Sequence, residues 1–138
     1  MDVTDLIGEG FKLFNEEKYA EAIKKLYQAL DGITDKSTQI SKQSWIQSGL
    51  GCCYFVQAKK TKDANKARKL FKQAAALFKR QLQLAGQLEN EQILIQQQIF
   101  AQFGLGRCYI ERVKRIKNTD KVEALFKKQA GKYLLAVY

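Results

Sequence analysis

Two segments of this chain, 55 residues apart, repeat each other and align without a gap. Residues 47–54 read QSGLGCCY and residues 102–109 read QFGLGRCY, and KLFK at residues 69–72 returns as ALFK at residues 124–127. A fixed internal period is typical of stacked helical arrays, because each unit buries its apolar face against the next one. The repeat therefore predicts an all-α fold built from similar units.

The spacing of apolar residues near 3.6 predicts six helices. It places them at about residues 4–15, 19–32, 37–60, 63–85, 89–116 and 119–138. Proline is absent, and the segments between the helices are short and polar, which favours antiparallel hairpins. We therefore expect one domain over residues 1–138, made of three hairpins at about residues 3–34, 37–86 and 89–138.

The first hairpin carries a recognisable pattern. Residues 9–14 (EGFKLF) and 19–23 (YAEAI), followed by Leu26, Ala29 and Leu30, resemble a tetratricopeptide repeat (TPR). The family places a small and a large apolar residue on its first helix, and Ala, aromatic, Ala on its second. The matching residues are Gly51, Tyr54, Ala67, Phe71 and Ala74 in the second hairpin, and Gly106, Tyr109, Val122, Phe126 and Gln129 in the third.

This resemblance covers nearly the whole chain and departs from the family where Val122 and Gln129 replace small residues. It implies a right-handed superhelical array of three antiparallel helix hairpins, a TPR-like α-solenoid of the long-helix variant. Gly10, Gly51 and Gly106 lack a side chain, so we expect a partner helix to approach closely where they stand.

The residue types disfavour catalysis and metal binding. Histidine is absent, which removes the commonest general base and the usual zinc ligand. Cys52, Cys53 and Cys108 lie within helical patterns and are interpreted as reduced, packed thiols. The segments around Gly51 and Gly106 resemble pieces of a phosphate loop, but neither follows a strand or precedes a Lys-Ser/Thr pair. We expect no enzymatic activity, no cofactor and no metal.

Hydropathy and charge indicate the environment in which we expect to find the protein. No apolar run approaches the ~20 residues of a membrane span, and the acidic start does not resemble a signal peptide. Residues 1–40 carry eight acidic and five basic side chains, whereas residues 41–138 carry nineteen basic and six acidic ones. We expect a cytoplasmic protein, with a nuclear one not excluded, whose later two-thirds attracts anionic surfaces.

A second apolar face follows the first helix of each hairpin at a spacing of three, four and three residues. In TPR arrays this face lines a concave groove that binds an extended segment or a helix of another protein. We therefore predict a partner-binding groove lined by Ile7, Phe11, Phe14, Trp45, Ser48, Phe55, Phe100, Phe103, Arg107 and Ile110. Two alternatives are that this face is ordinary core, or that it serves self-association.

A set of basic residues recurs with the same period and defines a predicted basic rim. Its members are Lys59, Lys60, Lys62, Lys66, Lys114, Arg115, Lys117 and Lys121. Residues related by the repeat lie side by side in a solenoid, so these bases form a ladder along one edge. The ladder is either a phosphate- or acid-binding surface or a solvated helix face, and no aromatic residues alternate with it as base stacking would require.

The pattern favours a non-catalytic adaptor or scaffold subunit that binds an apolar or amphipathic segment of another protein, an acidic one among the candidates. The alternative is a basic accessory subunit of a nucleic-acid-handling complex. Residues 132–138 (KYLLAVY) are apolar almost throughout, which adds a homodimer through this segment as a further hypothesis. The lysines and asparagines with which some TPR proteins bind acidic chaperone tails are absent, so we do not expect binding of that kind.

Overall fold

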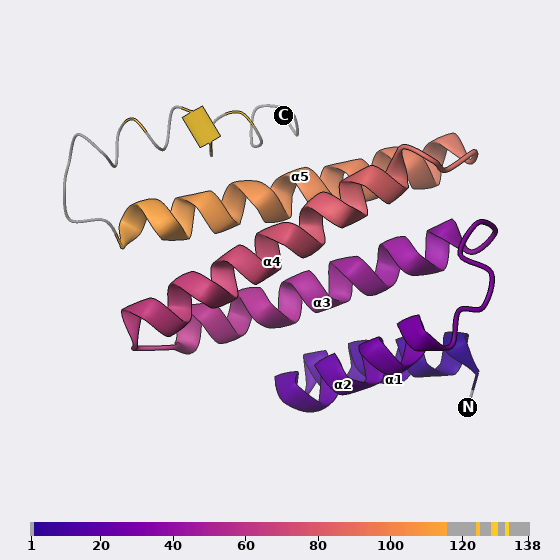
Figure 1. Cartoon of the computed structure of the whole chain (residues 1–138), viewed down its shortest axis with the longest axis horizontal. Coiled ribbons are helices and arrows are strands. Elements are labelled where there is room, and N and C mark those ends of the chain that lie inside the picture. The colour runs from indigo at the N-terminus through magenta and orange to yellow at the C-terminus, as the bar shows by residue number, and fades with distance from the viewer. Residues whose placement is uncertain (1, 116–123, 125–127, 130–131, 133–138) are drawn as a thin grey trace.

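The computed structural model describes residues 2–115 together with residues 124, 128–129 and 132. Within these residues the regular elements are α1 (Val3–Asn15), α2 (Tyr19–Asp31), α3 (Ile40–Lys60), α4 (Ala64–Ala85) and α5 (Glu91–Lys114), and no strand is present (Figure 1). The predicted all-α class is confirmed. Most of the sixth helix expected at residues 119–138, and with it the second half of the third hairpin, lies outside the described residues.

Side chains at the helix starts explain where the helices begin. The carboxylates of Asp2 and Asp63 and the amide oxygen of Asn90 accept hydrogen bonds from the first free backbone N–H groups of α1, α4 and α5. Helix α3 begins at Ile40, later than the predicted residue 37. The carboxylate of Asp35 accepts hydrogen bonds from the backbone N–H and the hydroxyl of Ser37, which stabilises a turn in competition with the helix.

Helix α3 occupies the centre of the described fold. It contacts each of the other four helices, with α4 and α5 on one side and the α1–α2 pair on the other (Figure 1). Residues 46–51 are all buried, and Ser48 among them borders the pocket described below. No helix in the described part of the chain is both long and apolar enough to cross a bilayer.

Two side chains are clamped between glycines of neighbouring helices. Leu26 of α2 lies between Gly10 of α1 and Gly49 of α3, where a Cβ atom added to each glycine would stand 2.7 and 3.0 Å from the leucine. The ring of Phe78 in α4 lies in the same way between Gly51 of α3 and Gly104 of α5, at 2.7 Å from either added Cβ. The expected close approach therefore occurs at Gly10 and Gly51.

A buried polar cluster joins the three longest helices. The hydroxyl of Ser44 (α3) donates a hydrogen bond of 2.6 Å to the amide oxygen of Gln97 (α5), and the amide nitrogen of Gln81 (α4) donates one of 2.9 Å to the same oxygen. All three residues are fully buried. The two hydrogen bonds to the Gln97 oxygen link α3, α4 and α5, while the amide oxygen of Gln81 and the amide nitrogen of Gln97 have no hydrogen-bond partner among the described residues.

Candidate partner-binding groove

Three aromatic rings form a continuous row across the first helix of each predicted unit. Trp45 of α3 lies between Phe11 of α1 and Phe100 of α5, with ring centroids 6.3 and 6.0 Å from the indole. Both distances are within the range of favourable aromatic pairs. The predicted face of the first helices is thus one continuous surface, and Trp45 is at its middle.

A pocket of about 290 Å³ opens beside this row. Seven of the ten predicted groove residues line it. They are Phe14, Trp45, Ser48, Phe55, Phe100, Phe103 and Arg107. The side chains that the spacing of three, four and three residues predicted on α1, α3 and α5 therefore surround one hollow.

The other three predicted groove residues, Ile7, Phe11 and Ile110, do not line the pocket. Phe11 contacts Trp45 from the α1 side, and Ile7 packs against the core around Leu26. Ile110 is half-buried and does not line the pocket.

Phe55, one of the predicted groove residues, lines the pocket but is only 4% exposed. It packs against Phe71 of α4 at 5.7 Å between ring centroids, because α3 is turned so that this ring enters the core. Its outer surface is covered by the guanidinium group of Arg107, 4.5 Å from the ring centroid. Phe55 therefore forms the wall beneath Arg107, and the exposed aromatic rings of the pocket are those of Phe100 and Phe103.

Arg107 is the cationic group of the pocket. Its guanidinium lies over Phe55 and also 5.9 Å from the centroid of Phe103, and it makes no ion pair with a described carboxylate. Burial raises the pKa of the nearby Cys52 thiol, and the positive charge of Arg107 partly opposes that rise. The pocket is thus apolar on its walls and carries an unneutralised positive charge at its edge.

Four further residues line the pocket outside the predicted set: Cys52, Val56, Phe78 and Gly104. Phe78 comes from α4, a second helix of a hairpin, which the groove prediction did not consider. A signal was present, since Phe78 continues the apolar stripe of Ala67, Phe71 and Ala74 at the next helical step. Gly104 is close to the ring because it is one of the two glycines that clamp Phe78.

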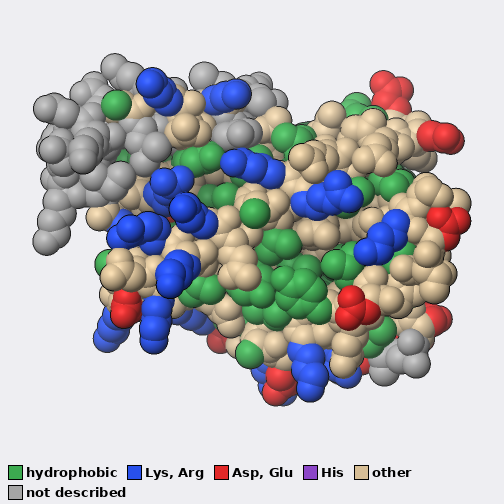
Figure 2. All heavy atoms as spheres, in the orientation of Figure 1, with side chains coloured by type: hydrophobic (Ala, Val, Ile, Leu, Met, Phe, Trp, Pro, Cys, Tyr) green, Lys and Arg blue, Asp and Glu red, His purple; other side chains and the backbone are tan. Residues whose placement is uncertain are grey.

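Basic side chains gather at one end of the molecule. On the face shown in Figure 2, Lys and Arg crowd toward the end where α3 and α5 finish and α4 begins, whereas acidic side chains are found mainly on the other edges. Lys59, Lys60, Lys62 and Lys66 are exposed there. The ammonium groups of Lys59 and Lys60 also lie over the rings of Phe55 and Tyr19, at 5.9 and 5.0 Å from their centroids.

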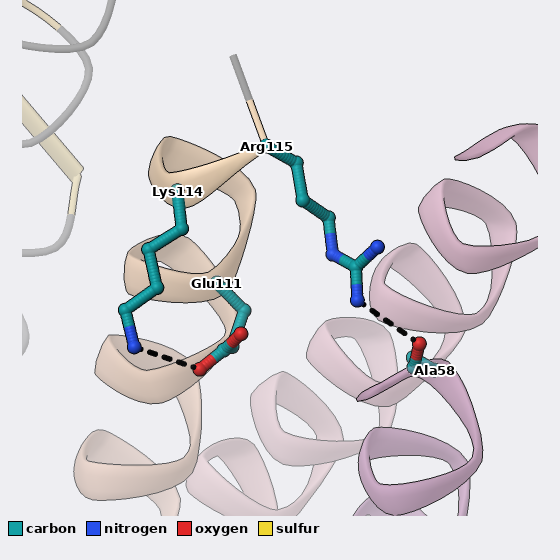
Figure 3. Close-up of polar contacts among 4 residues, drawn as sticks. All are labelled: Ala58, Glu111, Lys114 and Arg115. Carbon is teal, nitrogen blue, oxygen red and sulfur yellow. Dashed lines mark hydrogen bonds and ion pairs between the residues drawn. The ribbon is translucent and has the colours of Figure 1, made fainter. Parts of the chain in front are cut away.

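Two members of the basic rim make contacts within the protein (Figure 3). Arg115 donates a hydrogen bond of 3.4 Å to the carbonyl oxygen of Ala58 near the end of α3, and its guanidinium lies 5.2 Å from the ring centroid of Phe71. Lys114 forms an ion pair of 3.3 Å with Glu111. The Arg115 hydrogen bond joins the ends of α3 and α5, whereas the Lys114 ion pair lies within α5. Lys117 and Lys121 lie outside the described residues.

The thiols have the properties of packed side chains. Burial raises the pKa of both Cys53 and Cys108 to about 12, so both are protonated and weakly nucleophilic at neutral pH. Among the described residues no group of three or more His, Cys, Asp or Glu side chains is arranged to hold a metal ion. What the described site offers to a ligand is aromatic surface with a cation beside it.

No family model, no curated protein and no solved structure matches this chain. We therefore base the functional proposal on the contacts, burial and charges given above.

Proposed function

We propose that this protein is a non-catalytic adaptor with a TPR-like arrangement of helix hairpins, and that it binds an apolar segment of another protein in the groove between α1, α3 and α5. Clamping of one side chain between glycines of two successive first helices occurs twice, at Leu26 and at Phe78, and the glycines involved occupy corresponding positions, which supports the repeat arrangement. Both clamped residues come from the second helix of a hairpin and bridge two successive first helices.

The observation that carries the proposal is the pocket next to the Phe11–Trp45–Phe100 row. Its volume of about 290 Å³ is at the lower end of ligand pockets, which are roughly 300–1,000 Å³. That size suits one large apolar side chain of a partner. Phe100 and Phe103 are about 40% exposed, and exposed rings around a pocket are typical anchors of protein interfaces.

The charge around the pocket indicates what flanks that apolar side chain. Arg107 has no carboxylate partner among the described residues. The ammonium group of Lys59, in α3, also lies over the ring of Phe55. An acidic residue next to the docked side chain would pair with Arg107, and the basic end of the molecule would speed its association. The proposed ligand is thus a segment with a bulky apolar residue and neighbouring Asp or Glu.

Selection from a random displayed peptide library tests this specificity. We expect the recovered peptides to combine a large apolar residue with acidic neighbours, and to change Trp45 emission when titrated into the protein. Trp45→Ala is expected to weaken binding by about 2 kcal/mol, and Phe100→Ser and Phe103→Ser are expected to weaken it as well. Tyr27→Ser is the control, since Tyr27 is an exposed aromatic residue on α2 outside the pocket.

Two results would contradict the proposal. One is a selection that yields no peptide above background. The other is a set of peptides that bind Trp45→Ala, Phe100→Ser and wild type equally while each variant remains folded by circular dichroism.

The basic end supports a second candidate, an accessory subunit that binds nucleic acid. Lys59, Lys60, Lys62 and Lys66 are exposed within eight residues of one another. Titration of a fluorescent oligonucleotide at two salt concentrations tests this function, because binding through several phosphates weakens steeply with salt. Absence of binding at low salt would exclude it. The contacts of Lys60 with Tyr19 and of Arg115 with Ala58 favour the first candidate, since they give these bases a structural role.

A further inference from the structure

Exposed large apolar residues are concentrated on one half of α5. Among the described residues, five large hydrophobic side chains are exposed, and four of them are Ile95, Ile99, Phe100 and Phe103. Ile95, Ile99 and Phe103 follow one another at steps of four residues, so they form a single stripe along the helix. We call these three residues the α5 stripe. Contiguous apolar surface of this kind marks an interaction site.

The same half of α5 carries no charge. From Gln92 to Gly106 no charged residue occurs, although 28% of the chain is charged. The polar residues in this span are all glutamines: Gln92, Gln96, Gln97, Gln98 and Gln102. Gln97 is buried in the cluster with Ser44, and the other four are at least partly accessible. The α5 stripe is therefore flanked by neutral amides in a protein whose net charge is +10.

A surface of this composition is complementary to itself. An amide group carries both a donor and an acceptor, so a glutamine can pair with the same glutamine of an identical chain, which two lysines or two glutamates cannot do. Two-fold interfaces need such self-complementary patches, since each residue meets a surface identical to its own. A strongly basic protein meets least repulsion with its own copy through a face that lacks charge.

We propose that the α5 stripe binds a second copy of this chain, with the two α5 helices antiparallel about a two-fold axis at Ile99. In this arrangement Ile95 of one copy faces Phe103 of the other, and Ile99 faces its own counterpart. Lys114 is fifteen residues from Ile99. At 1.5 Å per residue, the two basic ends are then about 45 Å apart, far beyond the screening length of roughly 8–10 Å in physiological salt.

The α5 stripe overlaps the proposed ligand pocket at Phe103, so a second copy and a bound peptide compete for that ring. Ile95 and Ile99 do not line the pocket. Substitutions at these two positions therefore test the dimer while leaving peptide binding at Trp45 intact. The earlier hypothesis of a dimer through residues 132–138 concerns a segment that, except for Lys132, lies outside the described residues.

Sedimentation velocity over a concentration series of the full chain measures the proposed association. We expect a monomer–dimer equilibrium that changes little with salt near physiological ionic strength, because the two basic ends lie farther apart than the screening length. Ile95→Lys and Ile99→Lys are each expected to weaken the dimer by about tenfold or more, as at an interface hot spot. Tyr27→Lys is the matched control, since it places the same charge at the exposed hydrophobic residue on α2, and it should leave the equilibrium unchanged.

A cysteine at the proposed axis tests the geometry. Mild oxidation of Ile99→Cys should give a covalent dimer, because residue 99 faces its own counterpart, whereas Tyr27→Cys and the unmodified chain should give none. The proposal is overturned by a protein that remains monomeric at every concentration and salt. It is equally overturned by a dimer that resists both lysine substitutions, or by one that is lost only on deletion of residues 132–138.

Discussion

Replacing Gly104 by alanine should destabilise this protein, although the same change normally strengthens a helix. A Cβ atom at Gly104 would stand 2.7 Å from two carbons of the Phe78 ring and 2.8 Å from a third. Favourable carbon contacts lie at about 3.5–4.0 Å, so the ring must move by roughly 1 Å. Movement directly away from Gly104 is opposed by Gly51 on the other side of the ring, and the ring is only 3% exposed although one edge of it borders the pocket.

The magnitude follows from two opposing effects. Overpacking of a core typically costs about 1–3 kcal/mol, and the better helix propensity of alanine returns about 1 kcal/mol. We expect a net loss of up to about 2 kcal/mol in the free energy of unfolding. Gly8→Ala is the matched control, because Gly8 is in α1 and no atom lies within 4 Å of its added Cβ. It should stabilise the protein by about 0.5–1 kcal/mol.

Urea unfolding followed by circular dichroism and by Trp45 emission measures both changes. A second substitution checks the cause: in a Phe78→Leu background, which removes the ring, Gly104→Ala should cost much less than in the wild type. If Gly104→Ala stabilised the protein as much as Gly8→Ala, the clamp around Phe78 would not be rigid and the reasoning would fail.

Three further predictions concern other features of the structure. Gln97→Leu should destabilise by about 2 kcal/mol because it leaves buried hydrogen-bonding groups without their acceptor, while Gln73→Leu on the exposed side of α4 should have little effect; urea unfolding measures both. Glu17 adopts a left-handed conformation (φ 63°) after α1, so Glu17→Gly should raise the free energy of unfolding by about 1 kcal/mol, and an unchanged or lower value would contradict this. Finally, burial raises the pKa of the Cys53 and Cys108 thiols from 9 in the unfolded chain to about 12 in the folded protein. Between these values the unfolded chain holds fewer protons, so the free energy of unfolding should fall as the pH rises above 9. The urea midpoint should show that fall, and it should be smaller when both thiols are replaced by alanine.

The helices could be predicted from the sequence because their signals are local. Apolar periodicity located α1, α2 and α4 to within a residue or so at each end, and the break at Gly86 separated α4 from α5. The start of α3 was missed by three residues. The cause is also local, but it is a side-chain effect: the carboxylate of Asp35 competes for the backbone N–H of Ser37, and apolar spacing contains no information about such a turn.

The sequence predicted most of the residues that line the candidate groove, but not how deeply each of them is buried. Helical spacing was enough to place Phe11, Trp45 and Phe100 on a common face, and these three rings contact one another in sequence order. It did not reveal that Phe55 turns into the core against Phe71, because the rotation of α3 depends on how α4 packs on it. Nor did it predict Phe78, whose position depends on two glycines of two other helices.

The enclosure of α3 has a consequence for the order in which the protein opens. Residues 46–51 are buried, with α1 and α2 at one edge and α4 and α5 at the other. Helix α3 contacts helices at both edges, so it can unwind fully only after both edges have opened. Backbone amides in its centre should therefore exchange with deuterium only through global unfolding, whereas α1 and α2, which bury fewer residues, should exchange earlier. Because α3 contacts all four other helices, a ligand that stabilises the packing of α1 on α3 also slows the global unfolding through which the centre of α3 exchanges.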